Sequence, residues 1–196
     1  MSLSKEHKSI FIHIPKNGGT SVCEALGMGK SYHYTYRWYN EEHPDKWAQW
    51  FKFAIVRNPW DRLVSCYEYA KAEESYWHNN IGKKLNPHPD FELIKRISFK
   101  ETVDILHKYR GHRILRHAGW LPQVHWLWND TLKKESVVDE IYRLEDLSPL
   151  EKRFNIKLKK INATNKKNYK EYYTPELVDK VSEIYAKDIN LLKYEF

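Results

Sequence analysis

The segment that most constrains the fold is 9–25, which predicts a buried strand, a tight turn and the start of a helix. The apolar run 10–14 is typical of an inner strand of a parallel sheet, and Pro15 ends strand pairing where the chain must turn. Gly18 and Gly19 allow a turn whose backbone amides come close to a ligand. The segment therefore predicts an α/β domain with a ligand-binding turn at one edge of its sheet.

The same turn carries residue types that bind an anion. Backbone amides at the start of a helix favour phosphate or sulfate, and Thr20 and Ser21 add hydroxyl groups. Lys16 adds a positive charge, but it precedes Gly18, whereas a Walker A lysine follows its glycines and directly precedes Ser or Thr. The turn thus predicts an anion site without implying a magnesium-binding residue. An ordinary strand-to-helix turn is the alternative that this segment alone leaves open.

A second motif begins at the strand predicted over 51–56. Asn58 is a favourable N-cap and Pro59 suits the first helical position, so a long helix follows the strand at once. Arg57 then lies at the carboxyl end of a parallel strand, the edge where α/β proteins bind ligands. Ser65, about two helical turns further on, can turn its hydroxyl group toward the same anion. A surface ion pair for Arg57 and a packing role for Ser65 are the alternatives.

Length and composition indicate one soluble globular domain over residues 1–196. The chain is 41% hydrophobic and 30% charged, and no apolar run reaches the length of a membrane span. Its N-terminus lacks a signal-peptide pattern, so we expect a cytoplasmic protein. Cys23 and Cys66 are too few for a disulfide framework and are expected to be reduced. The net charge of +7 favours anionic partners such as nucleotides, acidic glycans, nucleic acid or a membrane surface.

The rest of the chain predicts further strands and helices. The expected strands are a short one within 31–38 and one over 137–143. The expected helices cover 44–50, 91–97 and 100–107, a short segment from Ser148, and a last helix from Pro175 to Leu192. Residues 79–90 are expected to form a loop. The lysine-rich segment 157–170 is interpreted as solvated surface, with a lid over a bound nucleotide as the functional alternative.

Two motifs together resemble a known family. Residues 13–21, His-Ile-Pro-Lys-Asn-Gly-Gly-Thr-Ser, and 56–65, Val-Arg-Asn-Pro-Trp-Asp-Arg-Leu-Val-Ser, are similar to signatures of sulfotransferases that use 3′-phosphoadenosine 5′-phosphosulfate (PAPS). The resemblance is to sulfotransferase family 2, the carbohydrate sulfotransferase-like group related to heparan sulfate 2-O-sulfotransferases. Weaker similarity continues through 121–123, 138–147, the loop at Asn162 and the final helix, so it covers most of the chain. It implies a P-loop NTPase-like, three-layer α/β fold whose central parallel sheet is flanked by helices.

The resemblance also implies a donor site. In that family the first motif holds the 5′-phosphosulfate and the second holds the 3′-phosphate, which here implies Arg57 and Ser65 for the latter. Arginine offers a forked, charged grip on phosphate, and serine offers a neutral donor. The residues implied for the phosphosulfate are Lys16, Asn17, Gly18, Gly19, Thr20 and Ser21. PAPS, released as adenosine 3′,5′-bisphosphate (PAP), would be the cosubstrate, and no metal is implied.

The implied reaction is transfer of a sulfuryl group to a hydroxyl or amine, with a carbohydrate as the expected acceptor. Lys16 is the candidate that stabilises charge on the leaving phosphate. His33 is the candidate base, because its unperturbed pKa suits proton abstraction near neutral pH and the family often has a histidine between the two motifs. A merely packed or exposed His33 is the alternative, and residues 41–43 (Glu41, Glu42 and His43) are reserve bases. His13 is expected in the core.

Other functions compete with this one. A nucleic-acid-binding domain would use the basic and aromatic surface, and a nucleotide kinase is disfavoured by the placement of Lys16 and by the lack of an obvious magnesium-binding acid after a strand. Trp38, Trp120, Trp126 and Trp128 could stack on sugars, although core packing is the favoured interpretation of most tryptophans. The spacing of His107, His112, His117 and His125 matches no usual metal-ligand pattern, so no metal site is predicted. The sequence indicates no oligomeric state.

Overall fold

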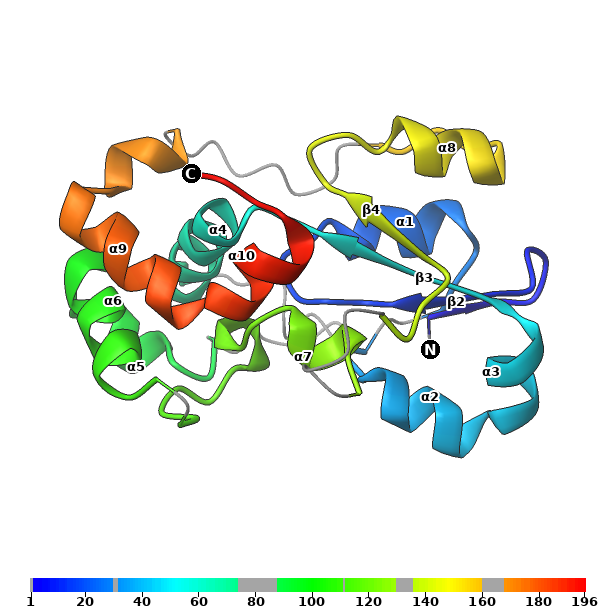
Figure 1. The fold of residues 1–196 in the computed structure, drawn as a ribbon, viewed down its shortest axis with the longest axis horizontal. Coiled ribbons are helices and arrows are strands. Elements are labelled where there is room, and N and C mark those ends of the chain that lie inside the picture. Colours follow the sequence, from blue (N-terminus) through cyan, green and yellow to red (C-terminus); the bar gives the residue numbers. More distant parts are fainter. Residues whose placement is uncertain (1, 30–31, 74–87, 111, 130–135, 160–167) are drawn as a thin grey trace. The chain divides into compact units, whose positions relative to one another are not determined.

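The computed structural model describes residues 2–29, 32–73, 88–110, 112–129, 136–159 and 168–196. The expected loop 79–90 and the Asn162 loop lie largely outside these residues. The chain forms two compact units, the first from Met1–Arg57 with Gln123–Asn165 and the second from Asn58–Pro122 with Lys166–Phe196. The first unit contains the sheet, and the described part of the second contains only helices (Figure 1). The single domain over 1–196 stays a prediction.

The sheet of the first unit has four strands in the order β1-β2-β3-β4. These strands are β1 (Leu3–Ser4), β2 (Ser9–Ile12), β3 (Phe51–Val56) and β4 (Glu140–Arg143). Strand β3 pairs in parallel with both β2 and β4, whereas β1 runs antiparallel to β2 at the edge. The predicted α/β class is therefore confirmed, with a mostly parallel sheet. Strand β1 was not predicted, because two residues are too few to show a period.

Helices flank this sheet. Figure 1 shows α1 and α8 on one side of the sheet and α2, α3 and α7 on the other. These helices are α1 (Gly19–Ala25), α8 (Ser148–Phe154), α2 (Tyr36–Glu42), α3 (Pro44–Gln49) and α7 (Val124–Leu127). Phe11, Phe53 and Tyr142 lie on β2, β3 and β4 and point to the face of the sheet beneath α1 and α8. There they form one buried cluster with Leu26 and Phe154. The edge predicted to bind a ligand therefore belongs to a sheet held by a packed core.

The structure corrects the prediction over 31–38. The expected strand is replaced from Tyr36 onward by helix α2, which ends at Glu42. Alternating aromatic and polar residues had suggested a period of two. Tyr36 and Tyr39, three residues apart, are instead the two buried residues of this helix, which is the spacing that places side chains on one helical face.

The second unit consists of seven helical segments among its described residues. They are α4 (Pro59–Lys71), α5 (Phe91–Ile94), α6 (Phe99–Lys108), the 3₁₀ helices η2 (Ala118–Trp120) and η3 (Tyr169–Tyr172), α9 (Pro175–Ile184) and α10 (Ala186–Leu192). The N-cap predicted at Asn58 is confirmed, and a capping box opens α6. The Asn58 side chain accepts from the backbone N–H groups of Trp60 and Asp61, and Ser98 with Glu101 forms a reciprocal capping box.

The last predicted helix is interrupted. Helix α9 ends at Ile184, and the backbone leaves helical geometry at Tyr185, where φ is −110° and ψ is 26°, before α10 begins. Tyr185 is 1% exposed, and its hydroxyl donates to the carbonyl of Trp120 at 2.9 Å. The apolar spacing that predicted one helix does identify the buried positions Val181 and Leu192, but it cannot register a break between them.

Candidate active site

The turn after β2 has a strained backbone at Lys16. Lys16 has φ of 70° and Gly18 has φ of 73°, both in the left-handed region. A lysine rarely adopts this conformation, and such strain is concentrated at functional sites. Gly18 caps α1, and Thr20 and Ser21 lie half-buried in the first turn of that helix. The predicted strand, glycine turn and helix are therefore present at one edge of the sheet.

Asn17 fastens this turn to the neighbouring strand. Its side chain is fully buried, and Nδ2 donates to the carbonyl of Ile55 and to Oε1 of Gln123, each at 2.7 Å. Ile55 belongs to β3, so these bonds tie the turn after β2 to the adjacent parallel strand. The contact of Asn17 with a phosphosulfate stays a prediction. Because Asn17 Nδ2 already donates to Ile55 and Gln123, the backbone N–H of Asn17 is the donor expected to make that contact.

Gln123 is a site residue that the sequence analysis missed. It is fully buried, its Oε1 accepts from the backbone N–H of Arg57 at 2.9 Å, and its Nε2 donates to the Arg57 carbonyl at 2.8 Å. One side chain thus pairs with both backbone groups of Arg57 and, through Oε1, with Asn17. The only sequence signal was its place in the segment 121–123, which shares the weaker family resemblance.

Arg57 meets the turn directly. It follows the last residue of β3, and its Nη1 donates to the carbonyl oxygen of Lys16 at 3.0 Å. The structure therefore brings two predicted site residues, Lys16 and Arg57, together within the first unit. Ser65 is buried on α4 in the second unit, so its predicted partnership with Arg57 stays a prediction.

His33 lies against the end of β2. Its Nδ1 is 3.0 Å from the carbonyl oxygen of His13, and the two imidazole rings meet edge to face with centroids 4.3 Å apart. The indole N–H of Trp126 donates to the backbone carbonyl of His33 at 3.1 Å. His13 is 7% exposed, as expected, and its burial, followed by the nearby His33, holds its pKa well below the usual range.

The reserve bases lie at the end of α2. Glu41 and Glu42 are exposed there, and His43 packs edge-on against Trp38 with ring centroids 5.5 Å apart. Nothing in the structure tests these three residues as the base, so they remain reserves.

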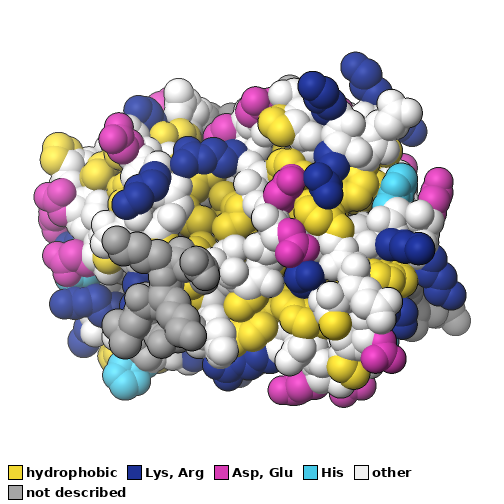
Figure 2. Space-filling model, turned by 45° about the vertical axis from the view of Figure 1, so that its right-hand side comes forward, with side chains coloured by type: hydrophobic (Ala, Val, Ile, Leu, Met, Phe, Trp, Pro, Cys, Tyr) yellow, Lys and Arg dark blue, Asp and Glu magenta, His cyan; other side chains and the backbone are white. Residues whose placement is uncertain are grey.

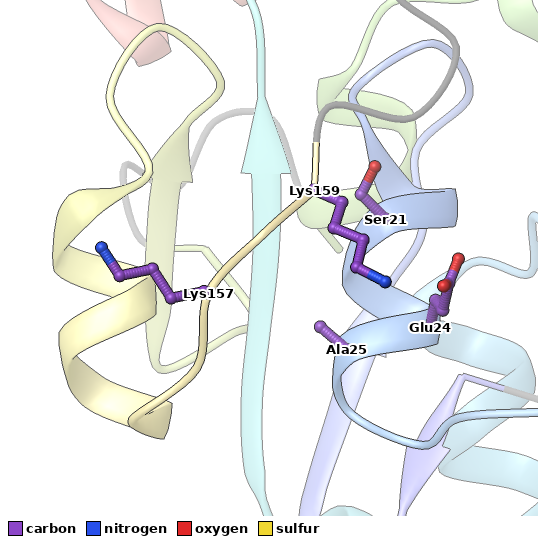
Figure 3. A pocket seen from close by; sticks show the side chains of 5 residues that line it. All are labelled: Ser21, Glu24, Ala25, Lys157 and Lys159. Atoms are coloured by element: carbon purple, nitrogen blue, oxygen red, sulfur yellow. The ribbon is translucent and has the colours of Figure 1, made fainter.

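A pocket of about 180 Å³ opens beside the turn. It is lined by Ser21, Glu24 and Ala25 of α1 and by Lys157 and Lys159 from the segment after α8. In Figure 3 the Lys159 side chain reaches toward α1, whereas Lys157 points toward α8. Ser21 thus belongs both to the predicted anion-binding turn and to the wall of a pocket that contains two lysines.

The four tryptophans considered for sugar stacking divide into two groups. Trp120, Trp126 and Trp128 are at most 6% exposed and therefore serve in the core, the favoured interpretation of such residues. Trp38 is half-buried and stacks on Tyr34 with ring centroids 3.9 Å apart, and Tyr34 in turn stacks on Tyr32. These three aromatic residues, which we name the aromatic stack, lie next to His33 in the sequence.

The four histidines considered as metal ligands, residues 107, 112, 117 and 125, have different surroundings. His107 pairs with Glu183 at 2.8 Å, His117 accepts from the N–H of Gly119, and His125 is exposed. Across the described ranges, no group of three or more His, Cys, Asp or Glu side chains has an arrangement that could hold a metal ion. None of the helices in those ranges is long and apolar enough to cross a membrane.

Charge is mixed on the one face of the molecule that Figure 2 shows. On the face in view in Figure 2, the Lys and Arg side chains of the described residues are scattered and interspersed with Asp and Glu. A protein that binds nucleic acid through charge alone would be expected to gather its basic side chains into a patch or stripe. This face offers no support for that alternative.

Comparison with known proteins identifies the family. A family model described as "Sulfotransferase family" matches residues 1–195, a range that includes the Lys16 turn, Arg57, Ser65 and Gln123. No curated protein and no solved structure matched the chain. Because the match covers nearly the whole sequence, the chain is a member of the sulfotransferase family, in the group called family 2, and is a transferase enzyme.

Proposed function

We propose that this protein transfers the sulfuryl group of PAPS to a hydroxyl or amine of an acceptor, most simply a carbohydrate. The observation that carries the proposal is the junction of Lys16 and Arg57. Arg57 and Lys16 follow adjacent parallel strands at their carboxyl ends, and the Arg57 side chain donates from Nη1 to the backbone carbonyl of Lys16. A ligand with two separate anionic groups suits such an edge better than one with a single phosphate chain.

The residues present fit this donor. The turn offers backbone N–H groups around Gly18 and Gly19 and the hydroxyls of Thr20 and Ser21, with the Lys16 charge at its entrance. Lys16 stabilises the charge that develops on the phosphate oxygen when the bond from sulfur to that oxygen breaks. Arg57 holds the 3′-phosphate, and Ser65 remains its proposed partner.

His33 takes the proton of the acceptor. As the acceptor oxygen forms its bond to sulfur, the oxygen–sulfur bond to the phosphate breaks and its electron pair stays on the phosphate. The acceptor proton moves to the imidazole of His33, so the products are the sulfated acceptor and PAP. The unperturbed pKa of a histidine side chain suits proton abstraction near neutral pH.

The pocket beside Ser21 is the proposed place for the nucleoside part of the donor. It adjoins the turn through Ser21, and Lys157 and Lys159 bring positive charge to its wall. Segment 157–170 had a lid over a bound nucleotide as its functional alternative. Lys157 and Lys159, which belong to that segment, would then contact the nucleoside.

The aromatic stack is the proposed acceptor surface. Tyr32, Tyr34 and Trp38 flank or follow His33, and Trp38 is the half-buried one among the four tryptophans considered for sugar stacking. Flat aromatic faces suit the apolar faces of sugar rings. A polysaccharide or an oligosaccharide is therefore the acceptor class to test first.

The cytoplasm is the proposed location of the protein.

A transfer assay tests the proposal. PAPS carrying radiolabelled sulfur is offered with desulfated heparan sulfate, dextran and a simple phenol, and both labelled product and PAP are measured. We expect label in a carbohydrate, with equal amounts of PAP, and a loss of about 100-fold or more in Lys16→Met. Lys5→Met, an exposed lysine of the same unit, is the matched control. Transfer of phosphate from ATP and magnesium, or salt-sensitive binding of oligonucleotides without any transfer, contradicts the proposal.

A further inference from the structure

The hydrogen bond between His33 and His13 determines a tautomer. The partner of His33 Nδ1 is a backbone carbonyl oxygen, which can only accept, so Nδ1 must carry the hydrogen and donate. A neutral imidazole with its hydrogen on Nδ1 has its lone pair on Nε2. Nε2 is therefore the nitrogen through which a neutral His33 accepts a proton.

The His13 ring is packed between this base and the turn. It meets the His33 ring edge to face at 4.3 Å and stacks on Phe11 at 5.4 Å. On another side it lies directly on Gly19, because a Cβ atom built on Gly19 would overlap the His13 imidazole. One buried ring thus separates His33 from the turn that carries Lys16.

We propose that His13 is a positioning residue for His33, its carbonyl fixing the Nδ1–H tautomer and its ring fixing the distance from His33 to the Lys16 turn. The inference deepens the proposed function and rests on it for the role of His33 as base. It assigns to His13 a part in the reaction that its burial alone would not suggest.

Two further observations support this arrangement. Trp126, which is 1% exposed, donates its indole N–H to the backbone carbonyl of His33, so His33 is fixed through its backbone as well as through its ring. Burial also keeps His13 neutral, since its pKa is well below the usual range. A neutral spacer places no competing charge beside the imidazolium that forms when His33 accepts a proton.

The tautomer is measurable in the resting protein. Nitrogen-15 spectra of the histidine rings distinguish a protonated ring nitrogen from one that carries a lone pair, and His33→Gln assigns the His33 signals by their loss. We expect neutral His33 to show a protonated Nδ1 and an unprotonated Nε2 in the wild type. A wild-type spectrum with the hydrogen on Nε2, or averaged between both nitrogens, overturns the inference. This experiment requires no activity, so it is decided even if the proposed function fails.

Variants of His13 test the part played by its ring. His13→Ala removes the ring but keeps the backbone carbonyl, so we expect the Nδ1–H tautomer to persist and kcat to fall by about 10- to 100-fold, with PAP affinity unchanged. His13→Phe keeps an aromatic ring as well as the carbonyl, and should restore most of kcat. His7→Ala, which removes a half-buried ring packed on Phe154, is the matched control.

Two results contradict the role of the ring. His13→Ala that keeps the wild-type kcat shows that the ring is not needed. A His13→Phe variant as impaired as His13→Ala, while folded by circular dichroism, shows that something other than ring packing is responsible. If His13→Ala fails to fold, the wild-type spectrum and His13→Phe still decide the inference.

Discussion

The Gln123→Ala variant should be less stable than a variant in which an exposed glutamine is replaced by alanine. The change removes the hydrogen bonds to Arg57 N, Arg57 O and Asn17 Nδ2 from a fully buried position. Each lost bond contributes about 1 kcal/mol, and leaving the two partly buried Arg57 backbone groups without this partner raises the cost. We expect a decrease of about 3 to 5 kcal/mol in the free energy of unfolding.

Urea unfolding followed by circular dichroism measures this effect. With a slope of about 2 kcal/mol per molar urea, the midpoint should fall by roughly 1.5 to 2.5 M without a change in slope. Gln49→Ala, at the exposed end of α3, should stay within about 0.5 kcal/mol of the wild type. Gln123→Glu should be at least as damaging as alanine, because a carboxylate cannot donate to the Arg57 carbonyl. A loss below about 1 kcal/mol for Gln123→Ala would refute the reasoning.

Three further predictions follow from the same part of the structure. Gly19→Ala should lower both stability and kcat, because the added methyl group displaces the His13 ring; thermal melts and the transfer assay measure this, and an unchanged melting temperature contradicts it. Because burial depresses the pKa of folded His13 below its unfolded value of 6.5, the unfolded chain binds more protons below that pH, and stability should fall with acidification by up to about 1.4 kcal/mol per pH unit. In His13→Phe the free energy of unfolding, obtained from urea unfolding at several pH values, should depend less on pH by this amount. An unchanged pH dependence contradicts the assignment of the effect to His13. Trp38→Ala should raise the KM for a carbohydrate acceptor while leaving that for PAPS unchanged, and equal changes in both contradict the acceptor surface.

Local signals made much of the site predictable. Gly18 and Gly19 after a buried strand, and Asn58–Pro59 after the next, are signals contained within a few residues, and the structure has a turn and a helix start at those points. Lys16 and Arg57 could be placed at the same sheet edge because parallel strands present their carboxyl ends together.

The remaining contacts depend on residues far apart in the chain. Asn17 is 106 residues from Gln123, and no local pattern reveals that their side chains meet. The bond between His33 and the His13 carbonyl likewise appears only once the segment after residue 31 is placed against β2. Helix α2 was missed because aromatic side chains at adjacent and alternate positions imitate a strand until burial shows which of them share a face.

Calorimetric titration with PAP tests the central claim most directly, because the claim is that the edge formed by the Lys16 turn and Arg57 binds a nucleotide with two separate anionic groups. PAP should bind the wild type more tightly than ATP with magnesium does. Arg57→Ala should weaken PAP binding by about 10-fold or more, as expected for the loss of a charged hydrogen-bond donor. Arg96→Ala, an exposed arginine of the second unit, should bind PAP as the wild type does. Equal affinity for PAP in wild type and Arg57→Ala, or no binding of PAP at all, would contradict the account.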